Sequence, residues 1–186
     1  MALSHFSHQQ LTVCDHHIQA HLGTFADQSH GQPLPPKPRR HKKVNESRFD
    51  ARTPLYRLAG VDLTTIEGIE EGTALVILSE IGTDLSRWPS VKHFCSWLGL
   101  SPQHKMSGGK VLSRRVRPGA QRVTVALRLA ARTVHQAHTA LGAFSRRMRS
   151  RLGAPKAITA TAHKLARLVY SLLKQGSAYV QQGIEA

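Results

Sequence analysis

Acidic residues are absent from one long segment of this chain. Residues 105–156 contain thirteen Lys and Arg and no Asp or Glu, whereas the whole chain of 186 residues has 26 basic and 11 acidic residues. Thirteen of the fifteen net positive charges therefore lie in that one segment. A local excess of this size predicts a polyanionic partner, most often nucleic acid, with a membrane surface as the weaker alternative.

Cysteine, aromatic residues and long apolar runs are also scarce. The two cysteines, Cys14 and Cys95, show no C-x-x-C spacing, which favours a reducing compartment and argues against a disulfide framework. No apolar run approaches the ~18 residues of a membrane span, and the first 30 residues lack the apolar stretch of a signal peptide. Because aromatic residues make up only 5% of the chain, aliphatic side chains and alanine must fill its core.

The N-terminal part of the chain is predicted to be a helix followed by a linker. Apolar residues recur at three- and four-residue steps over residues 3–26, so we place an N-terminal helix within residues 1–30. His17 and His21, four residues apart on this helix, are compatible with a metal pair. We favour a solvated histidine-rich face, because no cysteine or carboxylate pair joins them. Residues 31–48 are rich in proline and basic residues, which predicts an extended hinge that is also able to contact phosphates.

Residues 49–186 are predicted to form the main domain, which is mainly α-helical. Its first part, Thr64–Gly82, has the pattern of a helix, a glycine turn and a second helix, similar to a helix-hairpin-helix that places backbone N–H groups against phosphate. Glu70 and Glu71 occupy the position where an anion would approach, so we favour a hairpin that serves packing.

Three more helices are expected downstream of this hairpin. A short one follows Pro89, and its apolar residues would face the core. A heptad seam predicts one long helix over 121–145, and an apolar stripe predicts a last helix over about 155–175. The arginine-rich run 144–153 would join these two long C-terminal helices, and without acids to balance it we assign it to phosphate contact.

The stretch KMSGGKVLSRRVR, residues 105–117, forms a basic glycine loop with short runs compatible with a small hairpin. It does not match a Walker loop, because position 104 is His and Lys110 is followed by Val111. Ser107 is a candidate nucleophile for a phosphodiester, since surrounding cations would stabilise the negative charge of the transition state. From spacing alone, a passive phosphate-binding loop is the more frequent outcome.

The candidate phosphate-binding residues surround this serine and continue along the chain. The two glycines would let the backbone approach a phosphate closely, and the cations would neutralise it. The full set is Lys105, Gly108, Gly109, Lys110, Arg114, Arg115, Arg117, Arg122, Arg146 and Arg147.

Four collinear pieces of sequence resemble one known family. They are GVDLTTIEGI…TALVILSEIG, WPSVKHFCSWLGLSP, KMSGGKVLS and LGAPKAITATAHKLARLVY. In this order they look like the C-terminal transposase domain of the insertion-sequence transposases that combine a RuvC-like DEDD domain with a catalytic serine and are guided by a bridge RNA. The resemblance runs from about Phe49 to Ala186, and residues 1–48 look like that family's inter-domain, coiled-coil-like helix and linker.

The resemblance implies a function in the DNA transposition and recombination of a mobile element. It implies that Ser107 is the nucleophile and that the domain works on DNA as a homo-oligomer with a guide RNA, in the bacterial cytoplasm at the nucleoid. Magnesium is expected only with the acidic RuvC-like domain, which we expect to be missing through N-terminal truncation; this chain itself would bind no cofactor or metal. Enzymatic activity without that half is therefore in question, and the alternative is a non-catalytic basic helical module that holds DNA or RNA.

Overall fold

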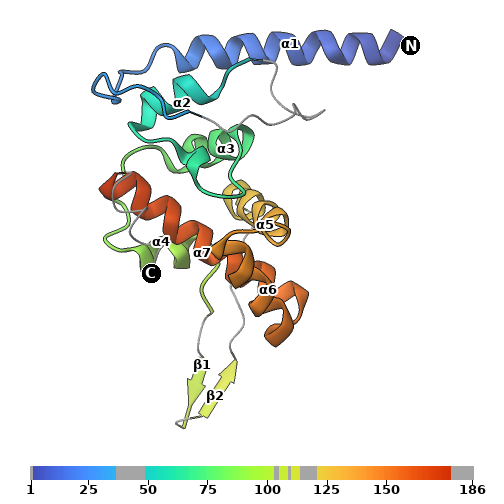
Figure 1. Ribbon diagram of the computed structural model, residues 1–186, viewed down its shortest axis with the longest axis vertical. Helices are drawn as coiled ribbons and strands as arrows, with labels where there is room; N and C mark the ends of the chain where they lie inside the picture. Colours follow the sequence, from blue (N-terminus) through green and yellow to red (C-terminus); the bar gives the residue numbers. More distant parts are fainter. Residues whose placement is uncertain (1, 37–48, 103–104, 109, 114–120, 177–186) are drawn as a thin grey trace.

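The computed structural model describes residues 2–36, 49–102, 105–108, 110–113 and 121–176. Within these ranges the chain is mainly helical, as predicted, with one two-stranded hairpin (Figure 1). The elements in order are α1 (Ala2–Leu22), α2 (Arg52–Ala59), the 3-10 turn η1 (Leu63–Thr65), α3 (Glu71–Ile81), α4 (Val91–Trp97), β1 (Lys105–Ser107), β2 (Lys110–Ser113), α5 (Arg122–Val134), α6 (Ala140–Leu152) and α7 (Ala154–Gln175). None of the described helices is both long and apolar enough to cross a membrane.

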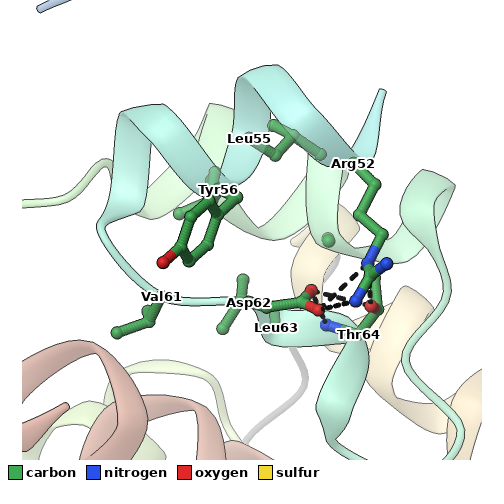
Figure 2. Close-up of a pocket in the computed structure, with 9 residues that line it drawn as sticks. Arg52, Leu55, Tyr56, Val61, Asp62, Leu63 and Thr64 are labelled. Atoms are coloured by element: carbon green, nitrogen blue, oxygen red, sulfur yellow. Dashed lines mark hydrogen bonds and ion pairs between the residues drawn. The ribbon is translucent and has the colours of Figure 1, made fainter. Parts of the chain in front are cut away.

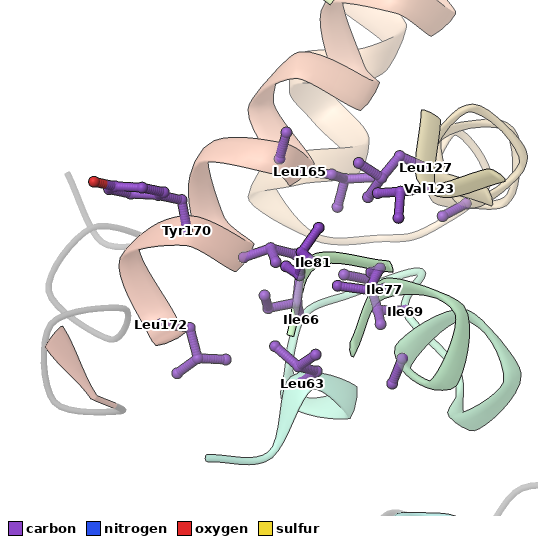
Figure 3. Close-up of a cluster of buried hydrophobic side chains, with 14 of the residues drawn as sticks. Leu63, Ile66, Ile69, Ile77, Ile81, Val123, Leu127, Leu165, Tyr170 and Leu172 are labelled. Carbon is purple, nitrogen blue, oxygen red and sulfur yellow. The ribbon is translucent and has the colours of Figure 1, made fainter. Parts of the chain in front are cut away.

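The core lies where α5 packs against both α3 and α7, and where α4 and α6 pack against α7 (Figure 3). The predicted seam of α5 and the stripe of α7 supply fully buried side chains, among them Val123, Leu127, Leu165 and Val169. Aliphatic residues and alanine fill most of this core, as the low aromatic content requires. Aromatic contacts gather at one place, where Tyr170 of α7 meets the rings around α4 and donates its hydroxyl to the Trp88 carbonyl at 2.8 Å.

The prediction of a single long helix over 121–145 is wrong, because the chain turns between α5 and α6. Thr139 caps α6, and its hydroxyl accepts a hydrogen bond from the Gly142 backbone N–H at 3.2 Å. The turn is tight, since a Cβ atom on Gly142 would lie 2.0 Å from the Ala137 carbonyl oxygen. The heptad seam is interrupted at this point, and the arginine-rich run that follows forms helix α6 where a connection was expected.

The glycine turn ahead of α3 serves packing. Only the short 3-10 turn η1 precedes it directly, so the first helix of the predicted hairpin is reduced to one turn there, and α2 lies farther upstream. Gly68 has φ +85°, and a Cβ atom on it would lie 2.4 Å from Val134 Cγ2 and 3.1 Å from the Ala130 carbonyl oxygen of α5. The turn is therefore pressed against α5, and glycine is required both by the backbone angle and by the close approach.

Residues 27–36, which we call the strap, lie against α2. The Gln28 N–H donates to the Arg57 carbonyl at 2.7 Å, and Arg52 Nη2 donates to the Pro35 carbonyl at 2.7 Å. Gly60 ends α2 at φ +69°, where a Cβ atom would lie 2.8 Å from the Gln28 carbonyl oxygen. The described part of the segment predicted as a hinge is therefore fastened to the domain.

A buried ion pair joins the start of α2 to the residue that caps η1 (Figure 2). Arg52 donates from Nε and Nη2 to Asp62 Oδ2, and its Nε also lies 3.1 Å from the Thr64 hydroxyl. Asp62 additionally accepts hydrogen bonds from the backbone N–H and the hydroxyl of Thr64, at 2.9 and 2.7 Å. The side chains of Arg52 and Asp62 are only 10% and 3% exposed, and a cavity of about 10 Å³ lies beside them. Such a cavity has room for one water molecule.

Helix α1 extends away from the rest of the molecule (Figure 1). Of its predicted apolar stripe, Leu22 is buried, whereas Leu11 is 57% and Ile18 37% exposed. On other sides of α1 and just beyond it, Phe6, Val13 and Phe25 are also exposed. The domain thus covers only the C-terminal end of this helix.

Candidate nucleic-acid interface

Ser107 lies at the tip of the hairpin that β1 and β2 form. The strands pair antiparallel, with Ser107 opposite Lys110 and Met106 opposite Val111, and the register shifts between Lys105 and Met106. Gly108 follows the serine at φ +55°, a left-handed conformation that glycine adopts without strain. The side chains of Ser107 and Lys110 are exposed. The glycine turn thus places a hydroxyl and an ammonium side chain next to each other at a solvent-facing tip.

The hairpin projects from the helical body at the end of the molecule opposite to α1 (Figure 1). Among the described elements the two strands pack chiefly on each other. A two-stranded hairpin without a covering layer is only marginally stable in water. A hairpin that projects in this way is accessible to a partner. The charge of the hairpin and of the surface around it determines which kind of partner binds.

The predicted phosphate-binding residues fall into three groups. Lys105, Gly108 and Lys110 belong to the hairpin, and Gly108 and Lys110 are exposed at its tip. Arg122 is exposed in the first turn of α5, and Arg146 and Arg147 are exposed on α6. The remaining four, Gly109, Arg114, Arg115 and Arg117, lie outside the described residues.

Basic residues are unevenly distributed between the two ends of the described molecule (Figure 1). Helix α1, at one end, contains no Lys or Arg and one acid, Asp15. The hairpin and α6 occupy the opposite half (Figure 1), and both belong to the segment 105–156, which has no acids. Between described residues, ion pairs join Arg52 to Asp62 and Arg57 to Asp27, on the α1 side of the fold. The basic half thus carries uncompensated positive charge, which suits the phosphate backbone of a nucleic acid.

Two further arginines of this half belong to the run 144–153, which was assigned to phosphate contact as a whole, but they were not selected individually. Arg149 and Arg151 are both exposed on α6. Only the position of the helix shows which arginines share a face. The spacing of four residues between Arg147 and Arg151 was the available signal, and it has meaning only once the run is known to be helical.

The histidines of α1 form no metal centre with their neighbours. No group of three or more His, Cys, Asp or Glu side chains in the described part of the chain is arranged to hold a metal ion. His17 and His21 are exposed, and the His21 ring packs edge-on against Phe25 with centroids 5.1 Å apart. This arrangement agrees with the solvated helix face favoured from the sequence.

Two titratable groups of the helical body have shifted pKa values. Burial raises the pKa of the Cys95 thiol from 9.0 to about 11, an effect that the charge of Arg167 partly opposes. Burial, reinforced by the charge of Arg167, lowers the pKa of His163 below its ordinary value of 6.5. A thiol that is buried and protonated in this way is inert, so Cys95 is not a candidate nucleophile.

One hollow in the described surface lacks the features of an anion-binding site. It is an open cleft of about 260 Å³ between the α3–α4 connection and the end of α7. Lys174 lines it, but its ammonium group is already within reach of the Tyr170 hydroxyl at 3.0 Å and the Pro89 carbonyl at 3.5 Å. Asp84 lines the same cleft and would repel a phosphate. The basic hairpin and α6 are better candidates.

Comparison with known proteins gives one family. The sequence model of the transposase family IS116/IS110/IS902 matches residues 48–149, a stretch that runs from just before α2 through the hairpin into α6. No curated protein and no solved structure matches the chain. The family model covers more than half of the chain, and it includes the hairpin that carries Ser107. The chain therefore belongs to the IS116/IS110/IS902 family of transposases.

Proposed function

We propose that this chain is a DNA-binding transposase domain in which Ser107 attacks a DNA phosphodiester. The observation that carries the proposal is the placement of an exposed serine beside Gly108 and Lys110 at the tip of a hairpin within the acid-free segment. Membership of a transposase family supports action in DNA transposition. The glycine leaves space for a phosphate to approach the serine, and the lysine supplies positive charge next to it.

The chemistry of the proposed step is a transesterification. The Ser107 Oγ atom forms a bond to phosphorus, its proton passes to solvent, and the P–O bond to the leaving strand breaks. The leaving oxygen takes up a proton and becomes a free hydroxyl end. Negative charge gathers on the phosphoryl oxygens in the transition state, where Lys110 would stabilise it. Because the phosphoserine link conserves the energy of the broken ester, attack by a second hydroxyl end can rejoin the strand.

Magnesium does not fit the described part of this chain. The family resemblance implies acidic ligands, but no cluster of three or more potential ligands occurs among the described residues. The proposal therefore assigns metal binding to acids of another domain or another chain. What this chain contributes is the nucleophile and the phosphate contacts.

A covalent adduct would test this function. The full chain is combined with the metal-binding part of the transposase, incubated with labelled insertion-end DNA, with and without magnesium, and separated on a denaturing gel. We expect a slowly migrating band with the wild-type chain and none with Ser107→Ala. Ser113→Ala is a matched control, since it removes another serine hydroxyl of the hairpin. Absence of the band when the chain is combined with the metal-binding part of the transposase would overturn the assignment of Ser107.

A second candidate function is non-catalytic binding of DNA or RNA. Two observations motivate it. Segment 105–156 contains thirteen basic residues, and the described residues include no group of three or more side chains that could bind a metal ion. If about 6–10 of these cations meet phosphates, affinity should fall roughly 10³–10⁵-fold between 50 and 200 mM salt. Under this alternative Ser107→Ala leaves binding unchanged and no adduct forms. A nearly flat salt dependence would refute nucleic-acid binding altogether.

We further propose that the domain works as a homo-oligomer, with a guide RNA as an additional partner. The exposed apolar side chains of α1, Leu11 and Ile18 among them, support the first part, because most of the stability of a helix in a protein comes from packing of its apolar face. Light scattering over a range of concentrations tests it. A monomeric mass at every concentration, for the wild-type chain and for Leu11→Glu alike, would contradict the oligomer.

A further inference from the structure

The outer face of α6, which we define by Arg147 and Arg151, carries positive charge that no described residue neutralises. Both side chains are exposed, and neither guanidinium group makes a hydrogen bond or ion pair with any described residue. Four residues separate them, so they lie one above the other, about 6 Å apart along the helix axis. On the same side of the helix the exposed residues Ala140, Ala143 and Ser150 are small, whereas Leu152, which follows Arg151, is a larger exposed residue. A backbone of phosphates could approach this face without steric hindrance.

Arg146, by contrast, is engaged within the fold. Its Nη1 donates to the His135 carbonyl at 3.1 Å and to the Ala137 carbonyl at 2.8 Å, in the turn between α5 and α6. These carbonyl groups lie at the C-terminal end of α5, where positive charge is favourable. Arg146 thus positions α6 relative to α5. The neighbouring Arg147 has no such contact, which separates two residues that look equivalent in the sequence.

Helix electrostatics do not account for this face. Basic residues in the last turn of a helix interact favourably with its dipole, and Arg149 and Arg151 are both in that position. Arg147 lies farther from the end, where the effect is largely lost, and it is aligned with Arg151. At 100° per residue, Arg149 points about 160° away from each of them, to the opposite side of the helix. The alignment of Arg147 with Arg151 is therefore a property of one face, beyond what the dipole explains.

We propose that the outer face of α6 is a second nucleic-acid contact, separate from the hairpin, in which Arg147 and Arg151 bind successive phosphates of a backbone. This rests on the proposed function, because the hairpin and α6 lie in the same half of the molecule and would meet the same polymer (Figure 1). Helix α6 packs on α7, and its buried residues are Gly142 and Ser145, of which Gly142 lies against the Ala137 carbonyl; Arg147 and Arg151 remain exposed. The contact would position the strand while the serine reacts.

The test compares two changes in the same helix. Arg147→Gln/Arg151→Gln removes the outer face, and Arg149→Gln is the control that removes a charge from the same helix at another angle. Each is made in the full chain carrying Ser107→Ala, so that no covalent step interferes. Anisotropy of a labelled 20-bp DNA duplex gives affinity between 50 and 200 mM salt. Equal melting temperatures of the variants show that the fold is retained.

Loss of two phosphate contacts should lower the slope of log K against log salt by about 1.8, and affinity at 0.1 M salt by roughly 60-fold. Arg149→Gln should change the slope by less than half of this. Arg147→Lys/Arg151→Lys should retain most of the binding, since the charges remain. A double glutamine variant that matches Arg149→Gln would overturn the proposal.

Parallel measurements with DNA and with RNA distinguish failure of this inference from failure of the proposed function. A structured RNA hairpin replaces the duplex in the second measurement, and a loss seen only there would assign the face to an RNA backbone. A second outcome is that the double variant binds both DNA and RNA with unchanged affinity while the affinity of the wild-type chain still falls steeply with salt concentration. That result refutes the α6 contact alone. If the chain with Arg147 and Arg151 intact binds neither polymer, the proposed function fails with it.

Discussion

Replacement of Arg52 should reveal how much the buried ion pair contributes to stability. Arg52→Met removes the guanidinium group but retains a chain of similar length. The Asp62 carboxylate, 3% exposed, then keeps only the two hydrogen bonds from Thr64, and the Pro35 carbonyl loses its donor. Breaking a buried pair by removing one partner costs about 3–5 kcal/mol, because the remaining charge is left without compensation.

Arg57→Met is the matched control on the same helix. Arg57 also faces an aspartate, but Nε lies 3.8 Å from Asp27 Oδ2 and the two side chains are 64% and 54% exposed. An exposed pair of this kind contributes about 0–1 kcal/mol. The two variants thus remove the same group from α2, and the expected difference of several kcal/mol comes from burial.

Urea unfolding followed by circular dichroism measures both. With a slope of about 2 kcal/mol per M, Arg52→Met should lower the midpoint by roughly 2 M, and Arg57→Met by less than 0.5 M. Limited proteolysis should cut the strap, residues 27–36, faster in Arg52→Met because its fastening to α2 is gone. Equal midpoints for the two variants would show that the pair is not a stabilising centre. Adding Asp62→Leu to Arg52→Met should recover much of the loss, since no buried charge then remains.

Three other predictions concern single positions. Gly142→Ala should destabilise the domain by about 3 kcal/mol, because the new Cβ would meet the Ala137 carbonyl. Gly72→Ala should stabilise it by about 0.5–1 kcal/mol, because this position on α3 has open space around it. Chemical denaturation of both variants measures the two opposite changes in the free energy of unfolding. At pH 8 iodoacetamide should label Cys14 and spare Cys95, whose pKa is raised to about 11, and mass spectrometry of the native chain would reveal any labelling at the buried site. Because the pKa of His163 is lowered by burial, the unfolded state binds a proton more readily, so the free energy of unfolding should fall as pH drops below about 6.5. In the variant that replaces this histidine with Gln, that dependence should be weaker, as unfolding curves between pH 5 and 8 would show.

Periodicity predicted those parts of the fold that depend on one helix burying one face. The seam of α5 and the stripe of α7 were recognised because Val123, Leu127, Leu165 and Val169 repeat at helical spacing, and all four are buried. The same periodicity failed at the turn between α5 and α6, since the seam continues through it in the sequence. The turn depends on a capping threonine and on one glycine packed against backbone, and such contacts exist only in the folded structure.

The candidate site was partly predictable for a similar reason. Composition located the basic segment, and the SGGK pattern selected Ser107, because both are local properties of the sequence. Which arginines share a face depends on where α6 begins, and the role of Arg146 depends on carbonyl groups nine and eleven residues away. The strap is also beyond sequence reasoning, because a Pro-rich run gives no sign of the buried Arg52 that holds it at Pro35.

The uneven distribution of charge has a kinetic consequence. Among the described residues, α1 carries no Lys or Arg whereas the hairpin and α6 carry several, so this part of the molecule has an electric dipole that the field of a polyanion would turn before contact. It would then meet DNA with the hairpin and α6 leading and α1 pointing away. Collisions in the wrong orientation would become rarer, so the association rate at low salt should exceed that of an evenly charged protein of equal net charge. Helix α1 would meanwhile remain clear of the DNA, with its exposed apolar side chains Leu11 and Ile18 turned toward solvent, where another protein could bind them.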